Sequence, residues 1–357
     1  MTKEAIAKVF MEPEAPFSTS TIAFPTLAQG EILVKNNFST ICTSDLHTFY
    51  GRRHSCSLSV LGHEIVGTIE AMASTEMKDY YGENLRIGDR ITWTIYAHDP
   101  DAENAKKGYP QKSEGLYKYG HEQMNDAYQL NGGFASHCHL RKNTTIFKLP
   151  EKLNQAEAAP LNCTHATIAG ALRLAGNIQD KNVLVNGVGM LGLSSCAMAK
   201  EFGASKVWAR DIDKAKAEQA LKFGAEKAFI FGDADLKNIS QNDGGIDLII
   251  ETSGNPNAIE DCLKQLTIGG TLVMVGAVFP QRDLSINAEY MVRNLLSIKG
   301  LHNYKPEDLA NAIKFLEKVH EKYPFGKLVG LTFNLEALDE AFAMANKGNY
   351  YRVGIHP

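Results

Sequence analysis

The chain has 357 residues, of which 44% are hydrophobic and 22% charged, and its formal net charge is −4. This composition predicts about two domains of a soluble protein with sizeable cores. It offers no basic field that would attract nucleic acid or an anionic membrane surface. No stretch approaches the roughly 20 apolar residues that span a bilayer, and the N-terminus shows no long apolar run, so we expect a cytoplasmic protein without a signal peptide.

The first part of the chain, residues 1 to about 160, reads as short strands separated by glycine turns. β-rich runs cover 31–35 and 65–70, and a Gly-Asp turn at 88–89 leads into another strand. This pattern predicts a β-barrel without long helices. The polar, irregular interval from 97 to 130 is long for a loop, and such segments are usually functional or form lobes of their own.

The pattern changes near residue 150. An Ala- and Leu-rich segment predicts a helix over 154–174, and from residue 182 apolar runs alternate with helical patterns. The predicted strands are 183–186, 206–210, 247–251 and 271–275, and the helices between them are 190–202, 214–223 and 257–266. This alternation predicts an α/β doubly wound parallel sheet. The rest of the chain adds the segment Ser297-Ile-Lys-Gly300, helices at 306–320 and 335–347, and a last strand at 352–356.

A glycine motif lies where the first strand of this sheet turns into a helix. Gly187, Gly189 and Gly192 follow G-x-G-x-x-G spacing, in which the glycines allow a tight turn, close approach of a pyrophosphate, and packing of helix on strand. Asp211 ends the second strand, where a carboxylate accepts hydrogen bonds from an adenosine ribose and repels a 2′-phosphate. We therefore expect NAD to be favoured over NADP, although the adjacent Arg210 would tolerate NADP if its side chain turned inward.

The stretch from Cys42 to Glu64 carries residue types of a metal site. Cys42 and His63 offer the thiolate and the imidazole that zinc prefers, and Ser44 and His47 are parts of a proton relay beside a metal. Any one of these residues alone is more often a buried cysteine or a surface histidine. The six cysteines are scattered along the chain, which indicates reduced thiols and argues against a disulfide framework.

Together these motifs resemble the zinc-dependent medium-chain alcohol dehydrogenases over essentially the whole chain. The resemblance rests on Cys42-x-Ser44-Asp45-x-His47, Gly62-His63-Glu64, Gly88-Asp89-Arg90-Ile91, and the glycine motif with Asp211. It implies a GroES-like β-barrel catalytic domain over 1–160 and 296–357, a Rossmann domain over 161–295, and an active site in the cleft. It also implies a small-molecule alcohol or aldehyde as substrate and a homodimer or homotetramer.

The same resemblance implies the roles of the site residues. The third zinc ligand is expected at Cys163, with His165 as the rival, and Glu64 matches the family's alternate ligand or a neighbour of the metal. Ser44 would take the alcohol proton and pass it toward His47, while hydride moves between substrate and nicotinamide. The resemblance also implies that Arg352 binds the pyrophosphate and Lys216 the adenosine side of the cofactor.

One departure from the family bears on metal content. Most of the family carries four structural-zinc cysteines, and the matching positions here are Asp99, Ala102, Ala105 and Ser113. We therefore expect one zinc ion per chain, the catalytic one. We also expect the lobe around these positions to be held by packing and hydrogen bonds, and to be comparatively mobile.

Two arginines and several polar runs bear on the substrate. Arg52 and Arg53 lie between the ligand motifs and suit an anionic head group through forked hydrogen bonds, although arginines are usually solvated. Several polar runs also resemble alcohol dehydrogenases associated with phosphonate catabolism, which predicts a hydroxyalkyl phosphonate or similar anionic alcohol. The alternatives are a polyol, sugar or amino-alcohol dehydrogenase, a catalytically idle dinucleotide-binding relative, and a zinc-free quinone or enoyl reductase, the last two disfavoured by the intact ligand set.

Overall fold

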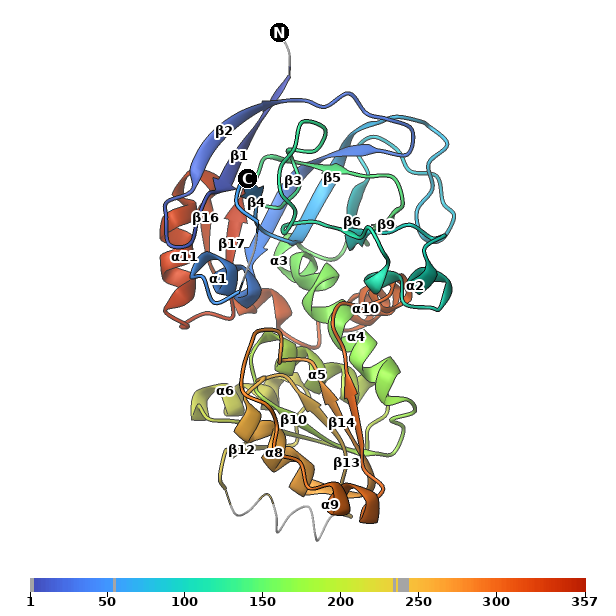
Figure 1. Ribbon diagram of the computed structural model, residues 1–357, viewed down its shortest axis with the longest axis vertical. Coiled ribbons are helices and arrows are strands. Elements are labelled where there is room, and N and C mark those ends of the chain that lie inside the picture. Colours follow the sequence, from blue (N-terminus) through green and yellow to red (C-terminus); the bar gives the residue numbers. More distant parts are fainter. Residues whose placement is uncertain (1–2, 54–55, 234–235, 237–243) are drawn as a thin grey trace. The chain divides into compact units, whose positions relative to one another are not determined.

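The structure is a computed structural model that describes residues 3–53, 56–233, 236 and 244–357. The chain divides into two compact units, drawn in Figure 1. The first comprises Met1–Cys163, Lys305–His320 and Phe325–Pro357, and the second comprises Thr164–Tyr304 and Glu321–Pro324. Each unit is described by itself. No helix of the described residues is both long and apolar enough to cross a membrane.

The first unit is built on antiparallel β-structure. Its strands are β1 (Glu4–Phe10), β2 (Ser18–Ala23), β3 (Ile32–Ile41), β4 (Ser59–Val60), β5 (Glu64–Met72), β6 (Arg90–Ala97), β7 (Tyr117–Lys118), β8 (His137–Leu140), β9 (Thr144–Lys148), β16 (Val329–Asn334) and β17 (Arg352–His356). They form a large sheet in the order β16-β17-β3-β5-β6-β7, in which β8 also pairs with β3 and β9 with β6, and a small sheet in the order β2-β1-β4. The long strand β3 is the centre of the large sheet.

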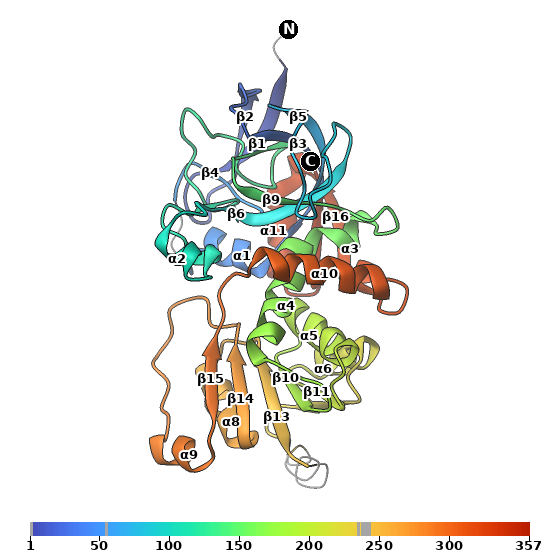
Figure 2. The ribbon, with the colours of Figure 1, turned by 90° about the vertical axis from the view of Figure 1, so that its right-hand side faces the viewer.

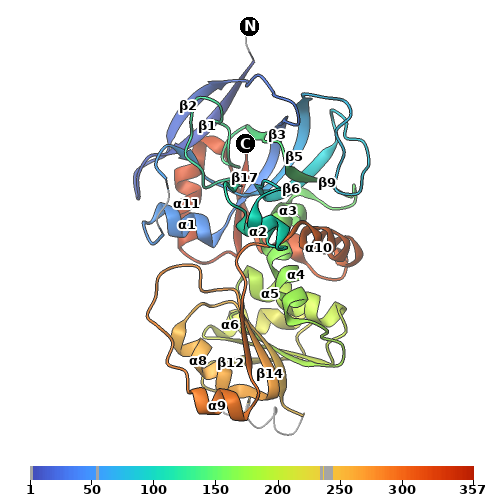
Figure 3. The same ribbon diagram turned by 45° about the vertical axis from the view of Figure 1, so that its right-hand side comes forward.

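Short helices connect and flank these strands. They are α1 (Thr43–Phe49), α2 (Glu103–Lys106), η1 (Pro110–Lys112), α3 (Gln155–Ala158), η2 (Ala159–Asn162), α10 (Pro306–Val319), η4 (Phe325–Leu328), η5 (Leu335–Ala337) and α11 (Leu338–Asn346). Figures 1 and 3 show α1 and α11 side by side. Phe49 of α1 and Phe342 of α11 pack their rings 4.9 Å apart in a common apolar cluster, which fixes the position of α1.

The pairing of β3 with β5 brings the two sequence motifs together. These strands run antiparallel with Thr40 opposite Glu64. Cys42 follows the end of β3 and His63 precedes the start of β5, so the register alone makes these two residues close neighbours.

The second unit is a six-stranded parallel sheet with helices. Its strands are β10 (Asn182–Asn186), β11 (Lys206–Asp211), β12 (Lys227–Ile230), β13 (Ile246–Glu251), β14 (Leu266–Met274) and β15 (Ser297–Gly300), in the order β12-β11-β10-β13-β14-β15. Figure 2 shows most of this order from β15 to β11. The helices are α4 (Thr164–Ala175), α5 (Met190–Glu201), α6 (Lys214–Gln219), η3 (Ala220–Phe223), α8 (Pro256–Gln265) and α9 (Ala288–Arg293). The strand order reverses direction at β10, as in a doubly wound sheet.

The structure differs from the sequence-based expectations at three points. The single helix expected over 154–174 is broken into α3, η2 and α4, because Pro160 lies in the first turn of η2 and Cys163 leaves helical backbone with φ −131° and ψ −79°. The segment from residue 296 was expected to rejoin the first domain, but β15 pairs parallel with β14 and completes the second sheet. The seven-residue helix α1 was not expected at all. The predicted α/β class with a doubly wound sheet is confirmed.

The lobe between β6 and β8 contains the positions that match the family's structural cysteines. The hydroxyl of Ser113 donates to the main-chain oxygen of Asp99 at 3.1 Å. The side-chain amide of Asn104 donates to the main-chain oxygen of Lys112 at 3.0 Å. Hydrogen bonds therefore join two of the positions where the family has thiolates.

Candidate functional site

Two thiols and an imidazole converge in the first unit. Cys42 is the residue before α1, His63 precedes β5, and Cys163 ends the turn η2. One ligand atom of each lies within 4.8 Å of the other two, and no other such group of three was found among the described residues. Cys42 and His63 are 8% and 2% exposed, while Cys163 is partly exposed. The set is therefore buried with one side still accessible.

The two thiols are close enough to influence each other. A hydrogen bond with Cys163 lowers the pKa of Cys42 well below its usual value, against the effect of burial and with help from the charge of Arg352. The same hydrogen bond raises the pKa of Cys163. The hydrogen bond therefore favours the thiolate form of Cys42, which is the form that binds a metal.

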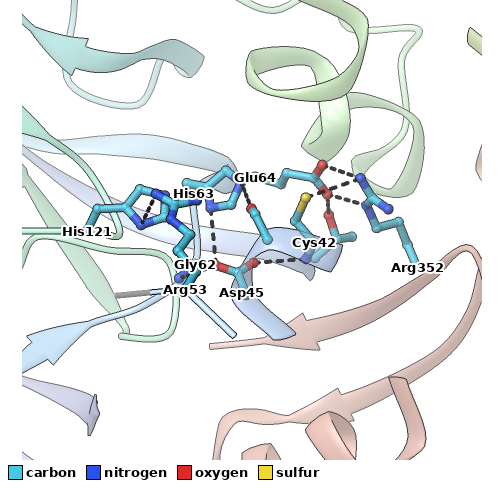
Figure 4. Close-up of polar contacts among 10 residues, drawn as sticks. Cys42, Asp45, Arg53, Gly62, His63, Glu64, His121 and Arg352 are labelled. Carbon is cyan, nitrogen blue, oxygen red and sulfur yellow. Dashed lines mark hydrogen bonds and ion pairs between the residues drawn. The ribbon is translucent and has the colours of Figure 1, made fainter. Parts of the chain in front are cut away.

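Asp45 orients this site, although its sequence motif alone did not indicate that role. Its side chain is fully buried and accepts from the Cys42 main-chain N–H at 2.9 Å and from the Gly62 N–H at 3.4 Å. It also lies 3.1 Å from Nδ1 of His63, as Figure 4 shows. Burial alone would lower the pKa of His63, but the charge and hydrogen bond of Asp45 raise it to about 10. The bond at Nδ1 leaves Nε2 of His63 to serve as the metal-binding atom. The signal in the sequence was the carboxylate three residues after Cys42, the spacing of a helix capping box.

The predicted relay residues both lie on α1. Ser44 has its Oγ 3.3 Å from Nε2 of His63 and is therefore at the metal-binding face of the imidazole. His47 is in the last turn of α1 and is partly exposed. Burial, and next the charge of Arg52, lowers the pKa of His47, which favours the neutral form that accepts a proton.

Glu64 and Arg352 form a buried ion pair beside the thiols. Both oxygens of Glu64 accept from Arg352, each at 2.7 Å, and Thr40 also donates to this carboxylate. Nη2 of Arg352 is 3.5 Å from Sγ of Cys42, and Nη1 donates to the main-chain oxygen of Tyr351 at 2.9 Å. Glu64 is not part of the three-residue group, and its expected role as an alternate ligand or a neighbour of the metal stays a prediction. For Arg352, the expected pyrophosphate contact stays a prediction.

His165, the rival for the third ligand position, lies on α4 in the second unit. It is fully buried, and its Nδ1 lies 2.9 Å from Oγ of Ser194 on α5. The group of three ligand atoms contains Cys163 and not His165. The geometry therefore favours the thiol.

The two arginines expected to bind substrate lie in different surroundings. Arg52 is exposed and donates to Oδ1 of Asn346 on α11 at 3.1 Å. Arg53 is partly buried, and its Nη2 lies 3.5 Å from Nδ1 of His121, whose ring is 5.1 Å from that of His63. Figure 4 shows His121 and Arg53 on the opposite side of His63 from the Glu64–Arg352 pair. Only Arg53 is thus brought near the ligand group, and His121 is a neighbour that sequence reasoning did not single out.

The glycine motif in the second unit has the geometry that a dinucleotide requires. Gly187 has φ +89°, and a Cβ on Gly192 would lie 2.0 Å from the Gly187 oxygen, so both positions need glycine. A Cβ on Gly189 would meet nothing within 4 Å, which leaves open space at the start of α5. Asp211 lies at the end of β11 and accepts from the Val188 N–H at 2.6 Å. The loop and the carboxylate are therefore adjacent.

Arg210 turns away from this loop. It is 2% exposed, and its guanidinium donates to Asn186 at 2.7 Å, to Asp261 at 2.5 Å and to Sγ of Cys262 at 3.2 Å. A buried guanidinium with these three partners is not available to a 2′-phosphate. Lys216 is partly exposed on α6, and its main-chain N–H lies 3.3 Å from Oδ1 of Asp213, the residue that caps this helix.

The residues at the two sites fit the two groups that the sequence implied, a zinc ion and a dinucleotide. Two sulfurs and one imidazole nitrogen are the ligands of a catalytic zinc site that keeps a fourth position open. The open helix start after two obligatory glycines fits a pyrophosphate.

Comparisons with known proteins agree with this geometry. A family model described as alcohol dehydrogenase GroES-like domain matches residues 28–151, and one described as zinc-binding dehydrogenase matches residues 190–318. An alcohol dehydrogenase of Geobacillus stearothermophilus is 30% identical over 350 residues, which cover 96% of each chain. A sorbitol dehydrogenase of Bacillus subtilis is 28% identical and covers 94% of this chain and 93% of its own. The crystal structure of an alcohol dehydrogenase from Thermotoga maritima superposes with a TM-score of 0.93 at 23% identity, covering 99% of this chain and 100% of that chain.

Proposed function

Because the chain belongs to the zinc-dependent medium-chain alcohol dehydrogenases, we propose that it transfers a hydride between an anionic alcohol, such as a hydroxyalkyl phosphonate, and NAD. The observation that carries the proposal is the convergence of Cys42, His63 and Cys163 within 4.8 Å. The three side chains come from separate parts of the chain and share no structural need to meet. A ligand set of this kind has a use only if it holds an ion.

The residues of the site divide the work as follows. Cys42, His63 and Cys163 would hold zinc, which when bound makes an alcohol hydroxyl acidic and polarises a carbonyl in the reverse reaction. Ser44, whose Oγ lies 3.3 Å from Nε2 of His63, accepts the alcohol proton. His47, at the partly exposed end of the same helix, takes it toward solvent. Glu64 and Arg352 keep their charges paired beside the thiols.

The proposal of NAD rests on residues of the second unit. The backbone at Gly187, Gly189 and Gly192 suits a pyrophosphate, and the carboxylate of Asp211 suits ribose hydroxyls and repels a 2′-phosphate. The buried contacts of Arg210 support the same choice, since they commit its charge elsewhere. We also propose that Lys216 contacts the adenosine part of the cofactor.

The proposal of an anionic substrate rests on Arg53. Its guanidinium lies beside His121, whose ring neighbours the metal-binding His63, and a guanidinium binds oxyanions through charge-assisted hydrogen bonds. Arg52 donates to Asn346 instead, so we assign it no part in binding. The sorbitol dehydrogenase among the relatives keeps a neutral polyol as the second candidate, but positive donors beside the ligand group favour an anion over a polyol.

A metal and substrate analysis of the purified protein tests the proposal. We expect one zinc per chain, and NADH formation when NAD is supplied with 2-hydroxyethylphosphonate, faster than with sorbitol and faster than with NADP as oxidant. Protein with Cys163→Ser should lose both the zinc and the activity. A zinc-free protein, or a zinc-loaded protein that oxidises no alcohol with either cofactor, would remove the proposal.

A further inference from the structure

The loop from Lys118 to Glu122 is packed directly on the main chain of the metal-binding motif. Gly120 has φ +75°, its N–H donates to the Asn131 oxygen at 2.7 Å, and a Cβ at this position would lie 2.5 Å from the Gly62 oxygen. The loop closes with a bond from the His121 N–H to the Lys118 oxygen at 3.1 Å. Only a glycine allows the loop to approach the Gly62 main chain this closely. The loop therefore lies beside the ligand group.

Lys118 and His121 stand at the two ends of this turn. The His121 ring lies 5.1 Å from the His63 ring at an interplanar angle of 33°. Lys118 is partly buried, and its ammonium interacts electrostatically with Arg53, Cys163, Lys112 and Glu122. These interactions indicate that the ammonium of Lys118 lies near Arg53 and the ligand group.

Arg53 reaches the same place from another element. Its main-chain N–H donates to the His47 oxygen at 3.0 Å, which anchors it at the end of α1, and its Nη2 lies 3.5 Å from Nδ1 of His121. With Nδ1 facing a guanidinium that only donates, the proton of a neutral imidazole resides on Nε2, which is then a donor as well. Donors from two separate segments therefore gather beside His63.

Positive groups gathered in this way repel one another. Burial, and next the charge of Arg53, lowers the pKa of Lys118 to about 8. Glu122 balances part of this charge, but its carboxylate is also engaged by the Lys118 main-chain N–H at 3.0 Å. Partly buried like charges are unfavourable unless an anion joins them, so the cluster indicates that its occupant is negative.

We infer that Lys118, Arg53 and His121 together form the site that recognises the anionic group of the substrate, with Lys118 as a specificity-determining residue that the sequence motifs did not assign. This inference rests on the proposed alcohol dehydrogenase activity. Three donors on separate side chains match the three oxygens of a tetrahedral phosphonate or phosphate-type dianion better than the two coplanar oxygens of a carboxylate. The cluster sets which alcohol binds, and the metal site acts on the hydroxyl.

Steady-state kinetics with matched alcohols test the role of Lys118. The substitution Lys118→Met keeps the length and apolar stem of the side chain and removes its charge, and Arg52→Met is the control at an arginine that donates to Asn346. For the zinc-loaded protein with NAD, we expect Lys118→Met to raise KM for 2-hydroxyethylphosphonate by about tenfold or more, since a charge-assisted hydrogen bond is lost. KM and kcat for 1-butanol should stay within about twofold in both variants. Equal losses on the two alcohols, or a fall in kcat for 1-butanol, would overturn the inference, the latter by showing that Lys118 acts in the chemical step.

A binding experiment separates this inference from the proposed activity. Methylphosphonate has the head group but no hydroxyl, and its affinity is measured by calorimetry on wild-type protein and on both variants, with thermal melting to verify folding. We expect Lys118→Met to weaken binding by about tenfold or more and Arg52→Met to leave it unchanged. Lys118-dependent binding in a protein that oxidises no alcohol would retain this site and reject the proposed function. Oxidation of neutral alcohols with equal methylphosphonate affinity in all three proteins would reject this site and retain the dehydrogenase.

Discussion

Asp45 offers the sharpest test of how the metal site is held together. Its buried carboxylate faces three N–H donors, from Cys42, Gly62 and His63, at 2.9, 3.4 and 3.1 Å. The substitution Asp45→Asn keeps the shape, but the amide has only one accepting oxygen, and its NH₂ group would face an N–H donor. Residues that orient a metal-binding histidine typically change metal affinity by about 10–100-fold. We therefore expect zinc affinity to fall by that factor, or about 1.4–2.7 kcal/mol.

The assay is a competition titration of zinc against a chromophoric chelator. Asp101→Asn is the control, because this side chain is 84% exposed and pairs with an exposed lysine. Circular dichroism must show that Asp45→Asn remains folded, since a general loss of structure would also release zinc. If the folded Asp45→Asn protein keeps its zinc affinity within about twofold of wild type, the role assigned to Asp45 is wrong.

Three further results follow from the site. Cys163→Ser should abolish stoichiometric zinc in metal analysis while His165→Asn retains it, and the reverse result would make His165 the ligand. Asp211→Ala should raise the ratio of kcat/KM with NADP to that with NAD by about tenfold or more, and an unchanged ratio would mean that another group selects the cofactor. Because the pKa of Lys118 is lowered to about 8, first by burial and then by Arg53, its charge is present at pH 7 and lost above pH 8. KM for 2-hydroxyethylphosphonate should therefore rise between pH 7 and pH 9.5 by at least about fivefold more than KM for 1-butanol, and parallel profiles would contradict this.

The second unit was the more predictable of the two from sequence. The strands β10, β11 and β13 begin and end within one residue of their predicted bounds. They are buried apolar runs between turn residues, so local composition defines them. The break between η2 and α4 was missed because the Ala- and Leu-rich pattern continues through it. The strand β15 was misassigned because its four residues, Ser-Ile-Lys-Gly, carry no sign of their pairing partner.

In the first unit, the sequence predicted the metal-ligand candidates but not the residues that hold them in place. Cys42 and His63 were predicted because few residue types bind zinc. The role of Asp45 depends on α1, whose seven residues are too few to show a helical period. The pairing of Glu64 with Arg352 joins residues 288 positions apart, and the approach of Gly120 to Gly62 depends on tertiary packing. Neither leaves a local signal.

The charges on the two sides of the ligand group differ in how completely they are paired. On one side, Arg352 is 4% exposed and matched by Glu64, and removing either partner of such a pair costs about 3–5 kcal/mol. That arginine is therefore committed to the protein. On the other side lie the positive charges of Arg53 and Lys118. Among the groups whose charge shifts the pKa of Lys118, Glu122 is the one carboxylate. Two thiolates would balance the charge of a bound divalent zinc ion, so the positive charge that Arg53 and Lys118 have in excess of Glu122 would remain. A neutral alcohol would leave this excess uncompensated, whereas an alcohol with a dianionic group would neutralise it, and we therefore expect substrate charge to govern selectivity more than chain length.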